Sequence, residues 1–416
     1  MSKLVPLSEY ARVNPPRDTQ GLGLSATISF ISMNDVSESG EWLSRATRKH
    51  SDVRSGYTSF LEGDILFAKI TPCMENGKGA HALGLWNGVG FGSTEFHVLR
   101  AGPQANARFV FHWTQSDQLR KKAEAFMIGS AGQRRVPASF FESFEVAHIS
   151  LPEQQHIAEI LDTLNEAIRR SEQVIAKLQQ VKQGLLHDLL TRGIDEHGEL
   201  RDPDRHPEQF KDSELGRLPR GWEAVALSTV ASVDRGKFAH RPRNDPRFYG
   251  GRHPFIQTGD VAAANGAVLS EASQSLNERG ARVSLEFPAG TIAITIAANI
   301  ADTAILGIPM FFPDSVVGAV VRPNNDIRWI ELCVRNAKAR LSARAPQSAQ
   351  KNINLKDLRP LRIPLPSEAE QRRCATLYED ADARIGSSIA CLDKLRALKA
   401  GLMHDLLTGR VRTLPP

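Results

Sequence analysis

The sequence repeats a long segment of itself, and this repeat limits the possible folds more than any other feature. Residues 182–191 read Lys-Gln-Gly-Leu-Leu-His-Asp-Leu-Leu-Thr, and residues 399–408 read Lys-Ala-Gly-Leu-Met-His-Asp-Leu-Leu-Thr. Glu153-Gln154 returns as Glu370-Gln371 at the same offset of 217 residues. Because the copies stand in the middle and at the end of the 416 residues, the sequence predicts two tandem units, each a globular part followed by a long helix.

Both copies carry apolar residues in alternating steps of four and three, which is the seam of a coiled coil. The first seam is Ile157, Leu161, Leu164, Ile168, Ser171, Ile175, Leu178, Lys182, Leu185 and Leu189. The second is Cys374, Tyr378, Ala381, Ile385, Ser388, Leu392, Leu395, Lys399, Leu402 and Leu406. Polar seam residues fix the register of a helix pair, and the two copies have them at equivalent positions, Ser171 with Ser388 and Lys182 with Lys399. We therefore expect the two helices to pack on each other. The alternative is that each helix packs only on its own domain.

The globular parts predict a mixed α/β (α+β) fold with many short strands. Short strings recur in both, such as Phe30-Ile31 with Asp35-Val36, which returns as Phe255-Ile256 with Asp260-Val261. Between these strings the two parts diverge, which favours one fold that presents two different recognition surfaces. The predicted boundaries are two domains at 1–150 and 219–366, two helices at 151–192 and 367–410, and an acidic linker at 193–218.

Charge is distributed unevenly along the chain, whose net charge is +5. Residues 234–253 hold six basic and two acidic side chains, residues 335–356 hold six basic and no acidic ones, and Arg120, Lys121, Lys122, Arg134 and Arg135 form a smaller cluster. Basic clusters in both units favour a polyanionic ligand, the alternative for each being a solvated face. No apolar run reaches membrane-spanning length and the start has no signal-peptide core, so we expect a cytoplasmic protein with no membrane contact.

The sequence predicts no active site. Asn14-Pro15-Pro16-Arg17 is similar to the loop of amino-methyltransferases, but Arg17 replaces the aromatic side chain that stacks on a flipped base. The phosphate-binding GxxxxGK[ST], the zinc-binding HExxH and the nucleophile GxSxG motifs are missing. Four scattered cysteines form no CxxC pair, which argues against a structural zinc site or a disulfide framework. No metal and no cofactor are expected on this chain.

The combination of motifs resembles a known family. Two variable α/β domains are each followed by a long helix that begins near a Leu-Pro pair and ends Gly-Leu-[Leu/Met]-x-x-Leu-Leu-Thr. This pattern, with Asp212–Trp222 between the units, resembles the specificity (S) subunit of type I restriction-modification systems. The strings Gly63-Asp64-Ile65-Leu66 and Gly92-Ser93-Thr94-Glu95-Phe96 are also similar to that family's scaffold.

The resemblance implies a non-catalytic DNA-binding subunit. Its two target-recognition domains would read the two halves of a bipartite double-stranded DNA target, and its helices would form an antiparallel coiled coil with pseudo-twofold symmetry. Two methyltransferase (M) subunits and the restriction (R) subunits would assemble on it. S-adenosylmethionine, ATP and magnesium would then be bound by those partners. The alternatives are a stand-alone DNA-binding regulator with a doubled recognition domain and an uncharacterised enzyme.

Amide and basic side chains of the globular parts are the candidates for DNA contact, because such groups pair with base edges and phosphates. They are Lys69, Asn76, Lys78, Gln133, Arg134, Arg135, Lys237, Arg241, Arg243, Arg247, Asn299, Gln347, Gln350, Lys351 and Asn352. A repeated strip beside the helix seams is expected to be exposed and to bind partner subunits. It consists of Leu186, His187, Leu190, Met403, His404 and Leu407.

Overall fold

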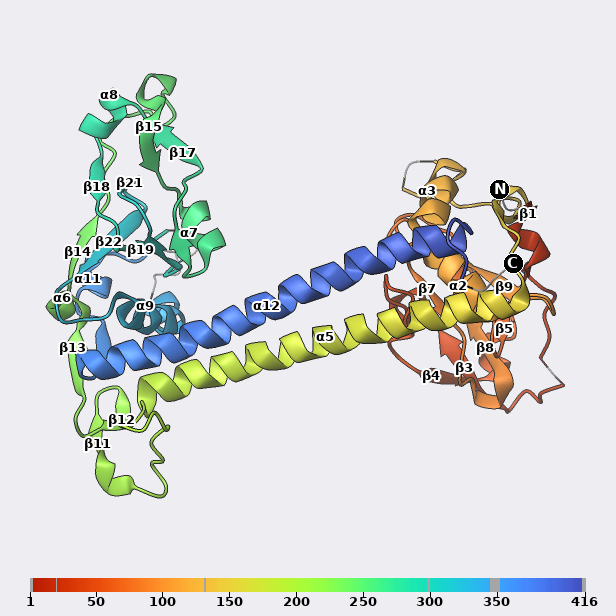
Figure 1. The fold of residues 1–416 in the computed structure, drawn as a ribbon, viewed down its shortest axis with the longest axis horizontal. Coiled ribbons are helices and arrows are strands. Elements are labelled where there is room, and N and C mark those ends of the chain that lie inside the picture. The colour runs from red at the N-terminus through yellow and green to blue at the C-terminus, as the bar shows by residue number, and fades with distance from the viewer. Residues whose placement is uncertain (1–2, 20, 131, 298–299, 345–351, 414–416) are drawn as a thin grey trace. The chain divides into compact units, whose positions relative to one another are not determined.

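A computed structural model describes residues 3–413 except 20, 131, 298–299 and 345–351 (Figure 1). The chain divides into two compact units. Unit 1 is Met1–Val174 with Ser388–Pro416, and unit 2 is Ile175–Ser387. Each unit therefore combines one globular part with half of each long helix. Within the described residues, no helix is long and apolar enough to cross a membrane.

Unit 1 contains two four-stranded sheets and a two-stranded pair. The first sheet is antiparallel in the order β2 (Ala11–Val13), β9 (Phe96–Ala101), β6 (Ile65–Ala68), β7 (Gly79–His81). The second has the order β4 (Ala46–Lys49), β3 (Thr27–Ile31), β8 (Val89–Gly92), β5 (Thr58–Leu61), with β3 and β8 parallel. Strand β1 (Leu4–Pro6) pairs with β10 (Glu145–Ala147). The helices are α1 (His50–Val53), α2 (Ala107–Gln115), α3 (Asp117–Ala125), α4 (Phe140–Ser143) and the long α5 (Leu151–Thr191).

Unit 2 has corresponding sheets. One has the order β14 (Ala231–Arg235), β22 (Val316–Val321), β19 (Ile292–Thr295), β20 (Thr303–Leu306), β16 (Val268–Leu269), and the other β17 (Gln274–Leu276), β15 (Tyr249–Phe255), β21 (Met310–Phe312), β18 (Leu285–Phe287). Strand β13 (Glu223–Ala226) pairs with β23 (Arg362–Leu365). The helices are α6 (Leu227–Val230), α7 (Thr258–Ala264), α8 (Glu278–Arg282), α9 (Ile327–Asn336), α10 (Lys338–Arg344), α11 (Leu355–Leu358) and the long α12 (Glu368–Leu407). Within segment 193–218, β11 (Phe210–Ser213) begins a hairpin with β12 (Gly216–Pro219).

The repeated strings occupy equivalent turns of the two units. Asp35 accepts a hydrogen bond from the backbone N–H of Ser32 at 2.7 Å, and Asp260 accepts one from Gln257 at 2.8 Å, so each caps the turn after an equivalent strand. The turns that lead into β6 and β19 contain Gly63 at φ +83° and Gly290 at φ +79°. Only glycine adopts this conformation without strain. The predicted α/β fold with an internal repeat is confirmed.

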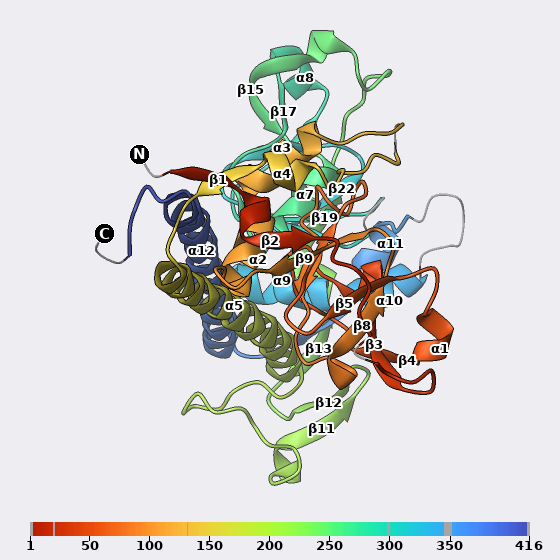
Figure 2. The same ribbon diagram turned by 90° about the vertical axis from the view of Figure 1, so that its right-hand side faces the viewer.

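The long helices pack on each other along the predicted seam, and every seam position is buried or half-buried. In unit 1 Arg396 forms an ion pair with Glu172 at 2.7 Å, and in unit 2 Lys182 pairs with Asp382. Because α5 residues further along the helix contact α12 residues closer to its start, the helices are antiparallel. They run side by side in both ribbon views (Figures 1 and 2).

The repeated glutamate fastens the start of each long helix. In unit 1 the buried Glu153 carboxylate accepts hydrogen bonds from the Arg412 guanidinium and from the backbone N–H of Thr413. The Arg412 hydrogen bonds hold the pKa of Glu153 below its usual value. In unit 2 Glu370 accepts from Arg201, from the Ile194 N–H and from the Trp222 indole N–H at 3.1 Å. Buried carboxylates with several donors are costly to disrupt, which explains why this residue repeats.

The neighbouring repeated glutamine joins each long helix to a shorter one. Gln154 accepts a hydrogen bond from the backbone N–H of Asn106, the N-cap of α2, at 2.9 Å. Gln371 accepts one from Asp326, the N-cap of α9, also at 2.9 Å. Each glutamine satisfies a donor that the start of the short helix leaves free. The Glu-Gln repeat is therefore structural in both units.

The expectation of an exposed strip beside the seams is wrong for three of its six residues. Leu190 is 3% exposed in the core of unit 2, and Met403 and Leu407 are 7% and 1% exposed in the core of unit 1. Near its end each long helix packs on a globular part as well as on the other helix, so more of its circumference is buried. Leu186 is half-buried, and His187 and His404 are exposed.

Candidate nucleic-acid interface

The six candidate residues of unit 1 lie together at one end of the sheet that contains β6. The backbone N–H of Val136 donates to the Lys69 carbonyl at 2.9 Å, and Ile70 forms a β-bridge with Arg135. The loop from β6 to β7 carries Asn76 and then Lys78, whose carbonyl accepts from the Ala68 N–H at 3.2 Å. Two segments about sixty residues apart thus form one polar edge, which contains Lys69, Asn76, Lys78, Gln133, Arg134 and Arg135.

Several of these side chains are held by the protein itself. Lys78 donates to the Met33 carbonyl at 2.9 Å, and Arg135 makes two hydrogen bonds of 2.9 Å to Glu95. The bond from Arg135 holds the pKa of Glu95 below its usual value. Asn76 donates to Glu38 at 2.9 Å, and Arg134 lies 3.8 Å from Glu75.

Two candidates at this edge are free to bind another molecule. Lys69 and Gln133 make no side-chain hydrogen bond or ion pair with the residues that the structure describes. Gln133 is exposed and Lys69 is half-buried. The side chains of these two candidates therefore need not break an internal hydrogen bond or ion pair to contact another molecule.

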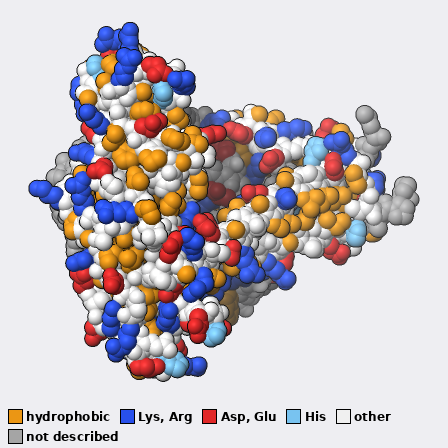
Figure 3. Space-filling view, turned by 60° about the vertical axis from the view of Figure 1, so that its left-hand side comes forward, with side chains coloured by type: hydrophobic (Ala, Val, Ile, Leu, Met, Phe, Trp, Pro, Cys, Tyr) orange, Lys and Arg blue, Asp and Glu red, His pale blue; other side chains and the backbone are white. Residues whose placement is uncertain are grey.

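Four of the nine candidates of unit 2, Lys237, Arg241, Arg243 and Arg247, lie between β14 and β15. Arg241 and Arg243 both pair with the carboxylate of Asp314, Arg241 at 3.0 Å, and Arg247 pairs with Asp245 at 2.7 Å. Lys237 is exposed and has no side-chain partner among the described residues. Figure 3 shows Lys and Arg side chains gathered at the end of unit 2 that contains β15 and α8.

The equivalent of the unit 1 edge is the loop between β19 and β20. Asn352 is exposed and forms a β-bridge with Ala297, as Arg135 does with Ile70 in unit 1. The remaining candidates lie outside the described residues: Asn299, Gln347, Gln350 and Lys351.

A hollow of about 540 Å³ beside the arginines adds residues that the sequence reasoning missed. Its lining consists of Arg243, Asn244, Pro246, Tyr249, Gly250, Gln257, Gln274 and Ser275. The Gln257 amide donates to the Gln274 amide oxygen at 3.2 Å. Amide groups can read the donor and acceptor pattern of a base edge. Asn244 was detectable as an amide within the arginine-rich window, but nothing in the sequence placed the two glutamines together.

Two basic residues from the clusters noted in the sequence are structural. Arg120 is buried and donates to the carbonyls of Thr114 and Met74, both at 2.7 Å. Burial lowers its pKa to about 9. Arg335 forms an ion pair of 2.7 Å with the fully buried Glu331. Glu331 lies just before the basic segment 335–356, so the composition of that segment did not reveal the pair. These two arginines are excluded from the interface. Among the described residues, no group of three or more His, Cys, Asp or Glu side chains could hold a metal ion.

Comparison with known proteins places the chain in a family. Residues 24–180 and 219–389 match the family "Type I restriction modification DNA specificity domain". The chain is 35% identical over 245 residues to the type I restriction enzyme EcoEI specificity subunit of Escherichia coli, a match to 58% of this chain and 41% of that protein. It is 40% identical over 153 residues to the EcoAI specificity subunit of the same species, covering 36% and 26%. The matched regions thus span less than half of either relative.

Two solved structures share the fold over nearly the whole chain. The HsdS subunit from Thermoanaerobacter tengcongensis gives a TM-score of 0.55 at 19% identity, with 98% of this chain and 97% of that chain covered. A chain from a study of complex assembly and conformational transition of the type I R-M system gives 0.62 at 19% identity, with 98% of both covered. Because the family match takes in most of the 416 residues, the chain belongs to the type I restriction-modification DNA specificity family.

Proposed function

We propose that this chain is the specificity subunit of a type I restriction-modification enzyme and reads a bipartite double-stranded DNA target, one half with each unit. The observation that carries the proposal is that the two units share one scaffold but display different polar side chains. Unit 1 presents Lys69 beside β6, whereas unit 2 presents arginines on the loop between β14 and β15 that pair with Asp314, with an amide-lined hollow beside them. One scaffold with two different polar surfaces fits two different half-sites.

The chemistry in this proposal belongs to partner subunits. Two methyltransferase subunits supply S-adenosylmethionine and modify the target, and restriction subunits supply ATP hydrolysis and cleavage. The chain itself positions them on DNA, and this task requires no cofactor of its own. We expect this assembly in the cytoplasm, because its substrates would be chromosomal and incoming DNA.

Base reading by the arginine cluster is tested with Arg243→Ala. An arginine that binds a base edge contributes about 1 to 3 kcal/mol at that position, so the variant should relax specificity in one half-site and leave the other unchanged. The measurement is binding of the assembled methyltransferase to a panel of single-base variants at two salt concentrations. The control is Lys69→Ala in unit 1, which should affect only the other half-site.

A uniform loss across all sequences for Arg243→Ala would show that it holds phosphate and does not read bases. A stand-alone regulator, the second candidate function, would bind its target just as tightly and specifically without the methyltransferase subunits. The same titration on the isolated chain distinguishes the two functions.

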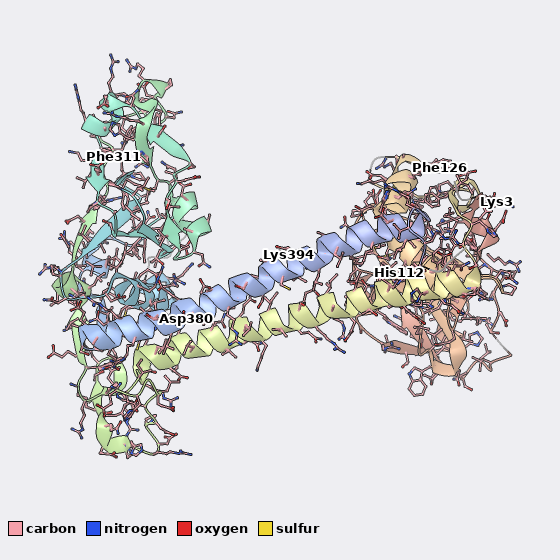
Figure 4. The ribbon with its side chains drawn as sticks, in the orientation of Figure 1. Lys3, His112, Phe126, Phe311, Asp380 and Lys394 are labelled. Atoms are coloured by element: carbon pink, nitrogen blue, oxygen red, sulfur yellow. The ribbon has the colours of Figure 1, made fainter. Side chains whose placement is uncertain are left out.

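Because three residues of the strip expected from the sequence are buried, we propose that the methyltransferase subunits bind instead to apolar side chains that are exposed along the two long helices. Val174 is 53% exposed and Leu398 is 52% exposed in unit 1, and Val181 is 55% exposed in unit 2. Each stands immediately before a seam residue and so has the same heptad position. Lys394 of α12, labelled in Figure 4, is exposed one helical turn before Leu398. Exposed apolar side chains at regular helical spacing fit a helical partner.

Charge on this strip should prevent assembly without unfolding the chain. Val174→Glu combined with Leu398→Glu is expected to abolish co-purification of the methyltransferase subunits, because each carboxylate would have to be buried against an apolar surface. The matched control is Gln173→Glu with Ala397→Glu, which adds the same charge at the preceding, exposed positions. Full assembly of the Val174/Leu398 variant, measured by affinity purification and light scattering, would exclude the strip.

A further inference from the structure

Two adjoining hollows in unit 1 lie between the helix pair and the globular part. The larger, about 500 Å³, is bounded by the end of α2, the start of α3 and the last turns of α12. The smaller, about 330 Å³, is bounded by the loop at 39–45, α2 and both long helices. Both have Lys399 in their lining, together with Ser39, Ile168 and Glu172.

Three hydrogen-bond donors around these hollows lack an acceptor. The indole N–H of Trp113 in the larger hollow and that of Trp42 in the smaller are buried and have no hydrogen-bond partner within the part of the chain that the structure describes. The Lys399 ammonium is likewise without a hydrogen bond or an ion pair there. Burial lowers the pKa of Lys399, against the weaker, opposite effect of Glu41 and Glu172. Native proteins seldom leave buried donors unsatisfied.

The equivalent lysine of unit 2 shows what Lys399 is missing. Lys182 pairs with the Asp382 carboxylate, and its ammonium lies 4.6 Å from the centre of the Tyr378 ring. At the repeat offset of 217 residues, Asp382 corresponds to Asn165 and Tyr378 to Leu161. Unit 1 therefore has the equivalent lysine, Lys399, but neither the carboxylate nor the aromatic ring that contacts it in unit 2.

Nearby acidic groups do not replace that carboxylate. Glu172 is paired with Arg396 at 2.7 Å, and Asp117 lies 4.0 Å from Lys121 on the same helix. Glu41 is exposed and makes no ion pair with Lys399. The lining of the larger hollow includes four aliphatic side chains, Ile168, Ala400, Met403 and Leu407, beside polar ones such as Gln115 and Gln118.

We propose that these hollows form a binding site for a carboxylate carried on an apolar body, with Lys399 and the two indole N–H groups as its donors. The Lys399 ammonium would pair with the ligand carboxylate, as Lys182 pairs with Asp382 in unit 2, and the four aliphatic side chains would contact the apolar body of the ligand. A hollow of this size suits a ligand of small-molecule or side-chain dimensions. The carboxylate is supplied either by a free metabolite or by an acidic side chain of a partner subunit.

The first test uses the full-length chain labelled with ¹⁵N at tryptophan. Titration with 4-methylpentanoate should shift the Trp113 and Trp42 indole resonances in a saturable manner at about 1 mM or below, whereas the neutral 4-methylpentanamide should not. Lys399→Met should weaken binding at least tenfold, and Lys399→Arg should retain most of it. The matched control is Lys182→Met in unit 2, which should leave the titration unchanged.

Equal shifts with the acid and the amide, or stronger shifts with inorganic phosphate, would overturn the proposal. The second test distinguishes the two sources of carboxylate, and only this test rests on the proposed function. Carbodiimide cross-linking of the complex with its methyltransferase subunits should join Lys399 to an acidic residue of the partner if the partner supplies the group. A saturable titration with no such cross-link assigns the site to a free ligand.

Discussion

Leu190→Asp should unfold unit 2, with a loss of about 4 kcal/mol or more in the free energy of unfolding. Leu190 is 3% exposed and belongs to the same core as Ile194, Trp222 and Trp329. An aspartate there would lose the leucine packing and bury a charge without a partner. Urea unfolding followed by tryptophan fluorescence measures the effect, because Trp222 and Trp329 both lie in this core.

The control for this experiment is a substitution at His187, three residues before Leu190 on the same helix. His187→Asp places the same charge at an exposed position one turn earlier and should leave the midpoint nearly unchanged. Leu407→Asp should cause the equivalent loss in unit 1, where Leu407 is 1% exposed. If Leu190→Asp left stability intact and removed only the methyltransferase subunits, the helix end would be a partner surface after all.

The helix seam was predictable from the sequence because its period is a local property. Each of the twenty seam residues is buried or half-buried, even at the polar positions Ser171 and Ser388. The matching of the two units was also predictable, because the repeated strings form turns whose backbone conformation allows few residue types. Gly63 and Gly290 are required by positive φ, and Asp35 and Asp260 by the same capping bond.

Burial of individual side chains was not predictable, because it depends on contacts between distant segments. A basic window looks the same whether its arginines face solvent or, like Arg120, bind buried carbonyl groups contributed by Met74 and Gly77. The seam rule also fails near the helix ends, where Leu190 faces a globular core that the helix period does not reveal. The same limit applies to the hollow with Gln257 and Gln274, which come from separate strands and loops.

Segment 193–218 illustrates the difference between composition and packing. Its acidic residues with Pro and Gly predict a solvated connector, and most of its side chains are exposed. Yet Ile194, Phe210 and Leu218 are buried, and Ile194 donates its backbone N–H to Glu370. A few apolar residues spaced along a polar segment are enough to fix it on a core.

Lengthening both long helices by whole heptads should change the spacing of the DNA half-sites without changing their sequences. Both helices are continuous, over 41 residues in α5 and 40 in α12, and their seams match residue for residue. One heptad inserted between Val174 and Ile175 and one between Cys391 and Leu392 keeps both seams in phase. Seven helical residues add about 10 Å, which corresponds to about three base pairs of DNA.

Three additional base pairs also rotate the second half-site about the DNA axis by about a third of a helical turn. The single-heptad variant should therefore bind its longer target more weakly. Three heptads in each helix add about 31 Å, close to one full turn of DNA, and should restore binding to a target with a spacer about nine or ten base pairs longer. Methylome sequencing of strains that carry each variant reads out both half-sites and the spacer. Insertion of three residues into α5 alone breaks the seam and should abolish methylation. An unchanged spacer in the three-heptad strain would show that the helix pair does not set the distance between the half-sites.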